Sequence, residues 1–255
     1  MGHEIRQIAT PADFAAVFDV SRETLERLAT YESLLRRWQK VVNLVATSTL
    51  DAVWHRHFAD SAQILRLAPH GARSWADLGS GAGFPGLVIA ILLAGRNSPP
   101  PRGEGLGVGG SPTTSVLRSP PPQPSPARGE EPTPRVTLIE SDSRKCAFLR
   151  EVARETGVTV EILSTRIELP ATQAKLDSPE VVSARALAPL DRLLGLAAPL
   201  FTPATVGVFL KGRDATAEIE TAAKAWTFAV EMVPSITEAT GRVVVIRDLQ
   251  PKPKD

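Results

Sequence analysis

Cysteine is almost absent from this chain of 255 residues, which contains Cys146 and no other. A single cysteine excludes an internal disulfide and any metal site built from several cysteines. We interpret Cys146 as structural, because it lies between Lys145 and Ala147 in a stretch with a helical pattern. A reducing cytoplasm agrees with this composition.

Long apolar runs are also absent, although 43% of the residues are hydrophobic. No run reaches the roughly 18 residues that a membrane-spanning helix needs, so we expect no membrane association. Charged residues interrupt residues 1–20, whereas a secretory signal has a continuous apolar core. We therefore expect a cytoplasmic protein.

An excess of charge of one sign is missing as well, since the formal net charge is only +1. Proteins that bind nucleic acid often have a basic excess, so a nucleic-acid site here must come from local clustering. Basic side chains contact phosphate without reading sequence, but such a cluster can equally be a solvated helix face. Two clusters qualify: Arg36, Arg37 and Lys40, and Arg144, Lys145, Arg150 and Arg154.

The first region, up to about residue 70, has helical patterns and no strand pattern. Apolar residues recur at close to helical spacing over 22–39, and residues 51–67 predict a second helix. His55 and His57 lie in this second helix. They have no third metal ligand nearby in the sequence, so we interpret them as packing or polar-network residues and expect no metal.

From residue 74 onward, short apolar strands alternate with helical segments, which predicts a doubly wound, mainly parallel α/β sheet. The predicted strands cover 74–78, 136–140, 158–163, 181–186 and 205–210. The predicted helices cover 87–93, 143–156, 190–200 and 214–226. Gly157 is placed to end the helix at 143–156. Two closing strands, 228–233 and 242–246, predict an antiparallel pair.

Prolines and glycines concentrate at about 96–135, which contains half of the chain's 22 prolines. A segment with so few apolar residues cannot offset its ordering entropy, so we predict a disordered loop. A near-repeat of Ser98–Glu104 at Ser125–Glu130 and the tolerance of long surface loops favour an inserted element. Deletion of about 97–134 is then expected to preserve folding and activity.

A glycine-rich turn at 79–86 follows the strand at 74–78 and precedes a helix, as in a nucleotide-binding βαβ unit. Glycines at alternate positions allow positive φ and let a ligand approach the backbone. A dinucleotide site needs its third glycine at position 84, which is Phe84, so the dehydrogenase pattern fails.

Alternate glycines after an acidic residue instead resemble the cofactor loop of S-adenosylmethionine enzymes. Loop amides would bind the carboxylate of the cofactor's methionine end. Asp77 would contact its cationic end, directly or through water, or would orient its own loop. The closing antiparallel strands are also typical of methyltransferases rather than dehydrogenases.

Glu140 ends the second predicted strand and is the candidate for the ribose hydroxyls, because a carboxylate accepts hydrogen bonds from two hydroxyls at once. It lies 61 positions after Gly79. Without the proline-rich segment of roughly 39 residues the separation falls to about 22, close to the roughly 20 expected. The alternative is a solvated glutamate at a strand end.

These motifs together resemble the bacterial small-subunit (16S) ribosomal RNA guanine-N7 methyltransferase family, once called glucose-inhibited division protein B. The similarity covers most of the chain outside the proline-rich segment. The segments that carry it are 75–86, 136–150, 182–186, 34–44 and His57-Phe-Ala-Asp-Ser61. The family commonly has Trp-Asn where this chain has Trp38-Gln39.

The resemblance implies a class I, Rossmann-like methyltransferase domain at 71–255, interrupted at about 96–135, with an N-terminal helical extension at 1–70. It implies S-adenosylmethionine as cofactor and 16S ribosomal RNA or the small ribosomal subunit as partner. The cofactor positions it implies are Gly79, Phe84, Glu140, Ser141, Asp142, Ile167, Glu168 and Arg185.

The implied reaction needs no catalytic base, because N7 of guanine has a free lone pair. Arg185 and Lys211, at the ends of neighbouring predicted strands, are candidates for positioning RNA or guanine, although Lys211 can equally be a solvated strand end. Two alternatives stay open: a small-molecule or protein methyltransferase, and a non-catalytic ribosome-binding protein on the same fold.

Overall fold

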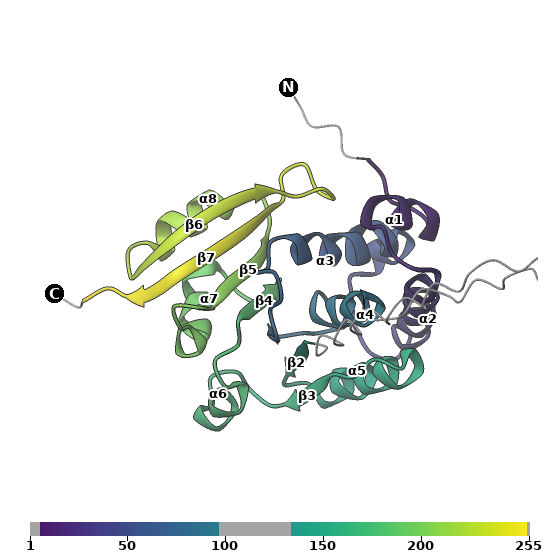
Figure 1. Ribbon diagram of the computed structural model, residues 1–255, viewed down its shortest axis with the longest axis horizontal. Helices are drawn as coiled ribbons and strands as arrows, with labels where there is room; N and C mark the ends of the chain where they lie inside the picture. The colour runs from purple at the N-terminus through teal and green to yellow at the C-terminus, as the bar shows by residue number, and fades with distance from the viewer. Residues whose placement is uncertain (1–5, 97–133, 254–255) are drawn as a thin grey trace, which may run out of the picture.

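The computed structural model describes residues 6–96 and 134–253 of the chain. Residues 97–133, most of the predicted insertion, lie outside the described residues. The described part is built on a seven-stranded sheet with the order β3-β2-β1-β4-β5-β7-β6 (Figure 1). The strands are β1 (Ser74–Leu78), β2 (Arg135–Glu140), β3 (Glu161–Ser164), β4 (Val181–Arg185), β5 (Val206–Lys211), β6 (Trp226–Pro234) and β7 (Arg242–Pro251).

The first five strands pair in parallel, and β7 runs antiparallel to both β5 and β6. This arrangement confirms the predicted doubly wound, mainly parallel sheet with a closing antiparallel pair. The chain winds outward from β1 in one direction to β3 and in the other from β4 to β6. The switch point therefore lies between β1 and β4, where open α/β sheets bind their ligands.

Alternate strand residues are buried on opposite faces of the sheet, so two separate cores form. On β7, Val243 and Val245 enter one core, while Val244 and Ile246 enter the other. The first core holds α2, α4 and α5, and the second holds α6, α7 and α8. The helices on the two faces are α4 (Gly86–Arg96), α5 (Ser143–Thr156), α6 (Pro170–Leu176), α7 (Leu190–Ala197) and α8 (Ala215–Ala222).

The N-terminal helices pack into the same core as α4 and α5. They are α1 (Pro11–Phe18), α2 (Arg22–Trp38), η1 (Thr47–Ala52), η2 (Trp54–Ala59), α3 (Asp60–Ala62) and η3 (Gln63–Arg66). Tyr31, Leu35 and Phe58 from this region are fully buried. The division of the chain at residue 70 stays a prediction.

The segment predicted as one helix at 51–67 is instead a succession of short helical turns, with a π-helical turn at η2. The prediction of one regular helix was therefore wrong, although the segment is helical. Wide π turns often occur at functional sites, where they re-aim side chains. Here His57 and Asp60 both contact Arg185 of β4.

Two helices were not predicted. Thr10 and Asp13 form a capping box that begins α1, and Pro170 occupies the first turn of α6. The strand predicted at 158–163 begins only at Glu161, because the N–H of Val158 bonds to the carbonyl of Ala153 in the cap that ends α5. Gly157 has the positive φ of 65° predicted for that cap.

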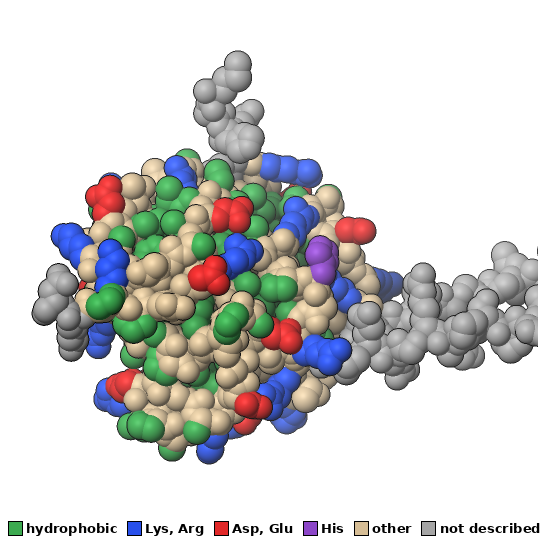
Figure 2. Space-filling model, turned by 60° about the vertical axis from the view of Figure 1, so that its left-hand side comes forward, with side chains coloured by type: hydrophobic (Ala, Val, Ile, Leu, Met, Phe, Trp, Pro, Cys, Tyr) green, Lys and Arg blue, Asp and Glu red, His purple; other side chains and the backbone are tan. Residues whose placement is uncertain are grey.

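Charged side chains of both signs are interspersed among polar and apolar ones on the face shown in Figure 2. This face shows no large patch of charges of one sign. The balance agrees with the formal net charge of +1 for the whole sequence. No helix in the described ranges is long and apolar enough to cross a membrane.

Candidate functional site

The main cavity lies at the carboxyl ends of β1 to β4, at the switch point of the sheet. Its volume is about 650 Å³, and it is lined by the segments that follow these four strands. The glycine turn follows β1, Glu140 ends β2 and Ser141 follows it, residues 165–168 follow β3, and Arg185 ends β4 and is followed by residues 186–188. A cavity of this size is typical of small-molecule and cofactor sites.

The glycine turn reaches the cavity in backbone conformations that other residues rarely adopt. Gly79, Gly81 and Gly83 have φ values of 65°, 58° and 93°. A Cβ atom at position 79 would lie 2.5 Å from the Leu187 side chain, and one at position 83 would lie 2.5 Å from the Tyr31 hydroxyl. Position 83 therefore needs glycine for space as well as for conformation, since a Cβ there would also lie 2.9 Å from Leu87 Cβ, whereas position 79 needs glycine for its positive φ.

Asp77 is fully buried beneath the turn and does not line the main cavity. Its Oδ1 accepts a hydrogen bond of 2.7 Å from Ser183 of β4, which in turn accepts from Trp75 Nε1. Burial raises the pKa of Asp77 to about 6. Of the two predicted roles for Asp77, this geometry favours orientation of its own loop.

Glu140 is held rigidly where β2 opens into the cavity. Its Oε2 accepts from the N–H of Gly81 at 2.9 Å, and its Oε1 accepts from the N–H of Asp142 at 2.8 Å. Glu140 is only 8% exposed, yet it lines the cavity. Each oxygen has a second lone pair, so the carboxylate can accept from two ligand hydroxyls. This geometry does not fit the alternative of a solvated strand-end glutamate.

The structure brings together all but one of the predicted cofactor residues. The cavity is lined by Gly79, Phe84, Glu140, Ser141, Ile167, Glu168 and Arg185. The side chain of Asp142 instead caps α5, where it accepts from the N–H groups of Arg144 and Lys145. These hydrogen bonds lower the pKa of Asp142. Asp142 touches the site through its backbone N–H, which fixes Glu140.

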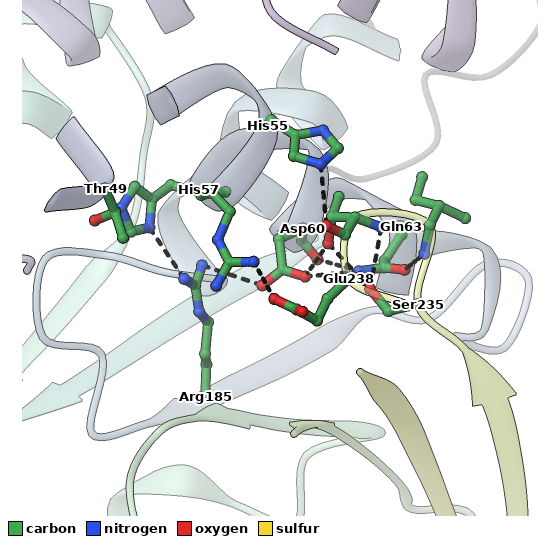
Figure 3. A network of polar contacts seen from close by, with 11 residues as sticks. Thr49, His55, His57, Asp60, Gln63, Arg185, Ser235 and Glu238 are labelled. Carbon is green, nitrogen blue, oxygen red and sulfur yellow. Dashed lines mark hydrogen bonds and ion pairs between the residues drawn. The ribbon is translucent and has the colours of Figure 1, made fainter. Parts of the chain in front are cut away.

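Arg185 projects from the end of β4 toward the N-terminal helices (Figure 3). Its Nη2 donates to His57 Nδ1 at 3.0 Å, and its Nη1 lies 3.3 Å from Asp60 Oδ2. Its guanidinium carbon also lies 5.8 Å from the centre of the Phe84 ring. Burial lowers the pKa of Arg185, but a guanidinium stays charged at any pH that proteins tolerate.

His57 lines the main cavity and is fixed in one tautomer. Arginine can only donate, so Nδ1 of His57 is the acceptor. The Thr49 hydroxyl donates to the carbonyl of Ala46 at 2.7 Å, so His57 Nε2 donates to Thr49 at 2.8 Å. Burial, with help from Arg185, lowers the pKa of His57 to about 3. The ring stacks on Phe84 with a centroid distance of 4.7 Å.

His55 lies in a second part of this polar network, which is connected to Arg185 through Asp60 and joins the helical turns at 54–66 to the loop between β6 and β7 (Figure 3). His55 Nδ1 accepts from the N–H of Ile8, and its Nε2 donates to the carbonyl of Thr237 at 3.0 Å. Asp60 Oδ1 accepts from Thr237 Oγ1 at 2.6 Å, and Arg56 pairs with Glu238. Both histidines therefore occupy polar networks, as predicted.

The network of Arg185, His57 and Asp60 was not predicted from the sequence. His57 and Asp60 lie three positions apart in a helical stretch, which places them on one side of a turn. That spacing was the only local signal. Their partner Arg185 lies 128 positions from His57 in the sequence.

Lys211 does not end its strand in solvent. Its Nζ donates to the carbonyl of Ala188 and to Glu218 Oε2, both at 2.7 Å, and Glu218 also accepts from the N–H of Leu190. The side chain is only 7% exposed. Lys211 thus holds the segment after β4, which forms a wall of the main cavity.

The two basic clusters lie on neighbouring helices, because α2 packs against α5. Arg36 pairs with Glu32, Arg154 with Glu151 and Glu155, and Arg144 with Asp142. Lys145 lines the main cavity. Four cations of these clusters form no ion pair with a described residue: Arg37, Lys40, Lys145 and Arg150.

The residues in the described ranges contain no group of three or more histidine, cysteine, aspartate and glutamate side chains arranged to hold a metal ion. Cys146 is buried on α5, and its Sγ donates to the carbonyl of Glu140 at 3.2 Å. This contact agrees with a structural role for the thiol.

Comparison with known proteins identifies the family. The model of the family described as rRNA small subunit methyltransferase G matches residues 24–97 and 130–245, on both sides of the proline-rich segment. A protein named ribosomal RNA small subunit methyltransferase G from Parvibaculum lavamentivorans is 45% identical over 95% of this chain and 91% of its own length. Its namesake from Rhodospirillum centenum is 46% identical over 94% of this chain and 91% of its own length. The chain therefore belongs to the rRNA small subunit methyltransferase G family.

Proposed function

We propose that this protein transfers a methyl group from S-adenosylmethionine to N7 of one guanine in 16S ribosomal RNA, as free RNA or within the small ribosomal subunit. The observation that carries the proposal is the main cavity with Glu140 fixed at its rim by the Gly81 and Asp142 N–H groups. Family membership favours this reaction over a small-molecule or protein substrate and over a non-catalytic role. Because ribosomal RNA is the substrate, we infer a cytoplasmic location.

The residues of the cavity suit the cofactor. Glu140 offers its carboxylate to the two ribose hydroxyls, as the acidic residue after the second strand does in related folds. The positive-φ turn at Gly79 exposes backbone to the methionine end. Ile167 is apolar and lies on the wall that follows β3, where the adenine would pack beside Glu168 and Ser141.

The reaction requires no proton removal before the methyl group moves, because the N7 lone pair is free to attack. When bound, S-adenosylmethionine supplies an electrophilic methyl group. His57 is the imidazole in the cavity, but both of its ring nitrogens are engaged by Arg185 and Thr49. The described residues therefore contribute by positioning the reactants and by electrostatics rather than as a general base.

RNA would approach over the cations that line or flank the cavity. Lys145, Arg166 and Arg192 line it, and Arg37 and Lys40 lie at the carboxyl end of α2, which packs against α5. Contacts of this kind bind phosphate and make affinity fall with salt. They would place the ribose-phosphate chain while the base enters the site.

The test is methyl transfer to small ribosomal subunits from cells that lack the protein, with the product mapped by nucleotide. We expect a single N7-methylguanine. Replacement of Glu140 by alanine should weaken cofactor binding, measured by calorimetry, by about tenfold or more, because it removes charge-assisted hydrogen bonds. The exposed Glu220→Gln variant is the matched control and should bind like the wild type. Cofactor binding without any N7-methylguanine would contradict the proposal.

A further inference from the structure

A second cavity of about 480 Å³ opens beside the main one. The two share one wall, formed by Arg185, Ala186, Leu187 and Ala188 at the carboxyl end of β4. The opposite wall of the second cavity comes from the loop between β6 and β7, with Ser235 and Glu238. A group bound in the second cavity would therefore be separated from the main cavity only by the wall that contains Arg185.

Most charged groups around the second cavity already have partners within its walls. Arg56 pairs with Glu238, and Lys211 pairs with Glu218. Asp60 Oδ1 accepts from Gln63 Nε2 at 2.9 Å and from Thr237 Oγ1 at 2.6 Å (Figure 3). The other oxygen of Asp60 faces Arg185 alone among the described residues.

Arg185 and Asp60 form an ion pair but no hydrogen bond. Asp60 Oδ2 lies 3.3 Å from Arg185 Nη1, but Nη1 has no partner in hydrogen-bonding geometry among the described residues. Both residues line the second cavity. Asp60 Oδ2 is a hydrogen-bond acceptor and Arg185 Nη1 is a donor beside it. A buried donor without a hydrogen-bond partner costs free energy.

We propose that the second cavity holds the acceptor guanine, with Arg185 donating to O6 and Asp60 accepting from N1–H. Along the edge of guanine the order is N1–H, O6, N7, that is donor, acceptor, nucleophile. Along the cavities the order is Asp60, Arg185, main cavity. With O6 on Arg185, N7 points toward the main cavity, where the methyl group would be. Adenine has an acceptor at N1 and a donor at C6, so both contacts would be repulsive.

This inference rests on the proposed function and adds the residues that determine specificity for guanine. The substitution Asp60→Asn tests it sharply. The asparagine oxygen stays at the Oδ1 position, because Gln63 and Thr237 both donate to it. The amino group must then occupy the Oδ2 position, where it is a donor and cannot accept from N1–H.

The experiment compares two substrates: small subunits reconstituted with ribosomal RNA that carries either guanine or N1-methylguanine at the modified position. For the wild type, we expect methyl transfer to N1-methylguanine to have a kcat/KM about tenfold lower or worse, as for loss of a charged hydrogen bond. In Asp60→Asn we expect slower transfer to guanine and a ratio between the substrates close to one. Glu220→Gln, the same kind of change at an exposed residue that lines neither cavity, should keep the wild-type ratio.

The ratio separates recognition from folding, since a misfolded fraction slows both substrates equally. Equal rates for the two substrates with the wild type would overturn the assignment, as would an unchanged ratio in Asp60→Asn. Absence of transfer to the guanine-containing subunits by the wild type is a different result. It would refute the proposed function, and this inference with it.

Discussion

Asp77 and His57 are buried ionisable side chains on either side of the glycine turn, and burial shifts their pKa values in opposite directions. The pKa of Asp77 is raised to about 6, and that of His57 is lowered to about 3. In both cases burial disfavours the charged form. The consequences for stability and for catalysis differ, because Asp77 lies below the turn while His57 lines the cavity.

The first prediction concerns Asp77 and pH. Between pH 4 and about 6 the folded state keeps the Asp77 proton that the unfolded chain releases, so the free energy of unfolding falls as pH rises through this range. The whole effect is about 3 kcal/mol, because the pKa rises from 3.8 to about 6 and each unit corresponds to about 1.4 kcal/mol. In Asp77→Asn this contribution is absent, because the amide does not titrate and can still accept from Ser183.

Urea unfolding of both proteins at pH 4.5 and pH 7 measures this difference. The wild type should lose more stability than the variant between the two pH values. His57 is neutral in the folded protein over this range but binds a proton in the unfolded chain. This contribution is common to both proteins and cancels in the comparison. If the free energy of unfolding changed equally with pH in the two proteins, burial would not raise the pKa of Asp77.

The second prediction concerns His57 as a positioning residue. His57→Ala should lower kcat/KM for RNA methylation by about tenfold, because Arg185 loses a charge-assisted hydrogen bond. His57→Asn should recover most of the loss, since its carbonyl oxygen takes the place of Nδ1. With its pKa near 3, His57 stays neutral from pH 5 to 8, so it should add no step to the rate profile there.

Steady-state kinetics of the three proteins across this pH range provide the measurement. A role in packing alone predicts that alanine and asparagine are equally harmful. A step near pH 6.5 that disappears in both variants would show that His57 titrates during turnover.

At the scale of elements, α2 supports the glycine turn from behind. Tyr31 is fully buried on α2, and its hydroxyl donates to the carbonyl of Ala82. Its ring stacks on Phe84 with a centroid distance of 5.4 Å, and Phe84 stacks on His57. A helix outside the sheet thus fixes both ends of the segment from Ala82 to Phe84.

The third prediction follows from this contact. Tyr31→Phe should lower the free energy of unfolding by about 1 to 3 kcal/mol, because the buried Ala82 carbonyl loses its donor. It should also weaken cofactor binding, since Ala82 lines the main cavity. Denaturation and calorimetry measure the two effects. The control is Thr30→Ala, which removes an exposed hydroxyl from the neighbouring position and should change neither stability nor cofactor binding. If Tyr31→Phe behaved like this control, the hydrogen bond from Tyr31 to the Ala82 carbonyl would be dispensable.

At the scale of the whole molecule, the sheet and its two cores are complete in the described residues on either side of the proline-rich segment. α4 ends at Arg96 and β2 begins at Arg135, and Arg96 and Pro134 line the same cavity. The family model likewise matches up to residue 97 and again from residue 130. A short connection would therefore be long enough to join α4 to β2.

The fourth prediction is that replacing residues 98–133 with a short glycine–serine linker preserves folding and methyl transfer. The removed residues lie outside the described ranges, and loop closure entropy changes only slowly with loop length. Thermal unfolding and the methylation assay on small subunits measure the outcome. Loss of cooperative unfolding would show that the segment belongs to the fold, and loss of activity with an intact fold would assign it a role in the reaction.

The sequence by itself determined the sheet, the glycine turn and the position of Glu140. Apolar runs mark the buried strands, and alternate glycines after a strand have few uses other than a turn that a ligand approaches. The helix at 143–156 was predicted to the residue, because Gly157 ends it locally. Such features depend on neighbours within a few positions, which a sequence displays directly.

Only the tertiary structure decided how the site is held. The π turn at η2, the burial of Asp77 and the partners of Arg185 all depend on residues that fold together from distant parts of the chain. Arg185 was predicted to belong to the cofactor pocket, but its position between two cavities follows from contacts with His57 and Asp60. Local patterns encode strands and turns, whereas the geometry of a polar network is set by packing between elements.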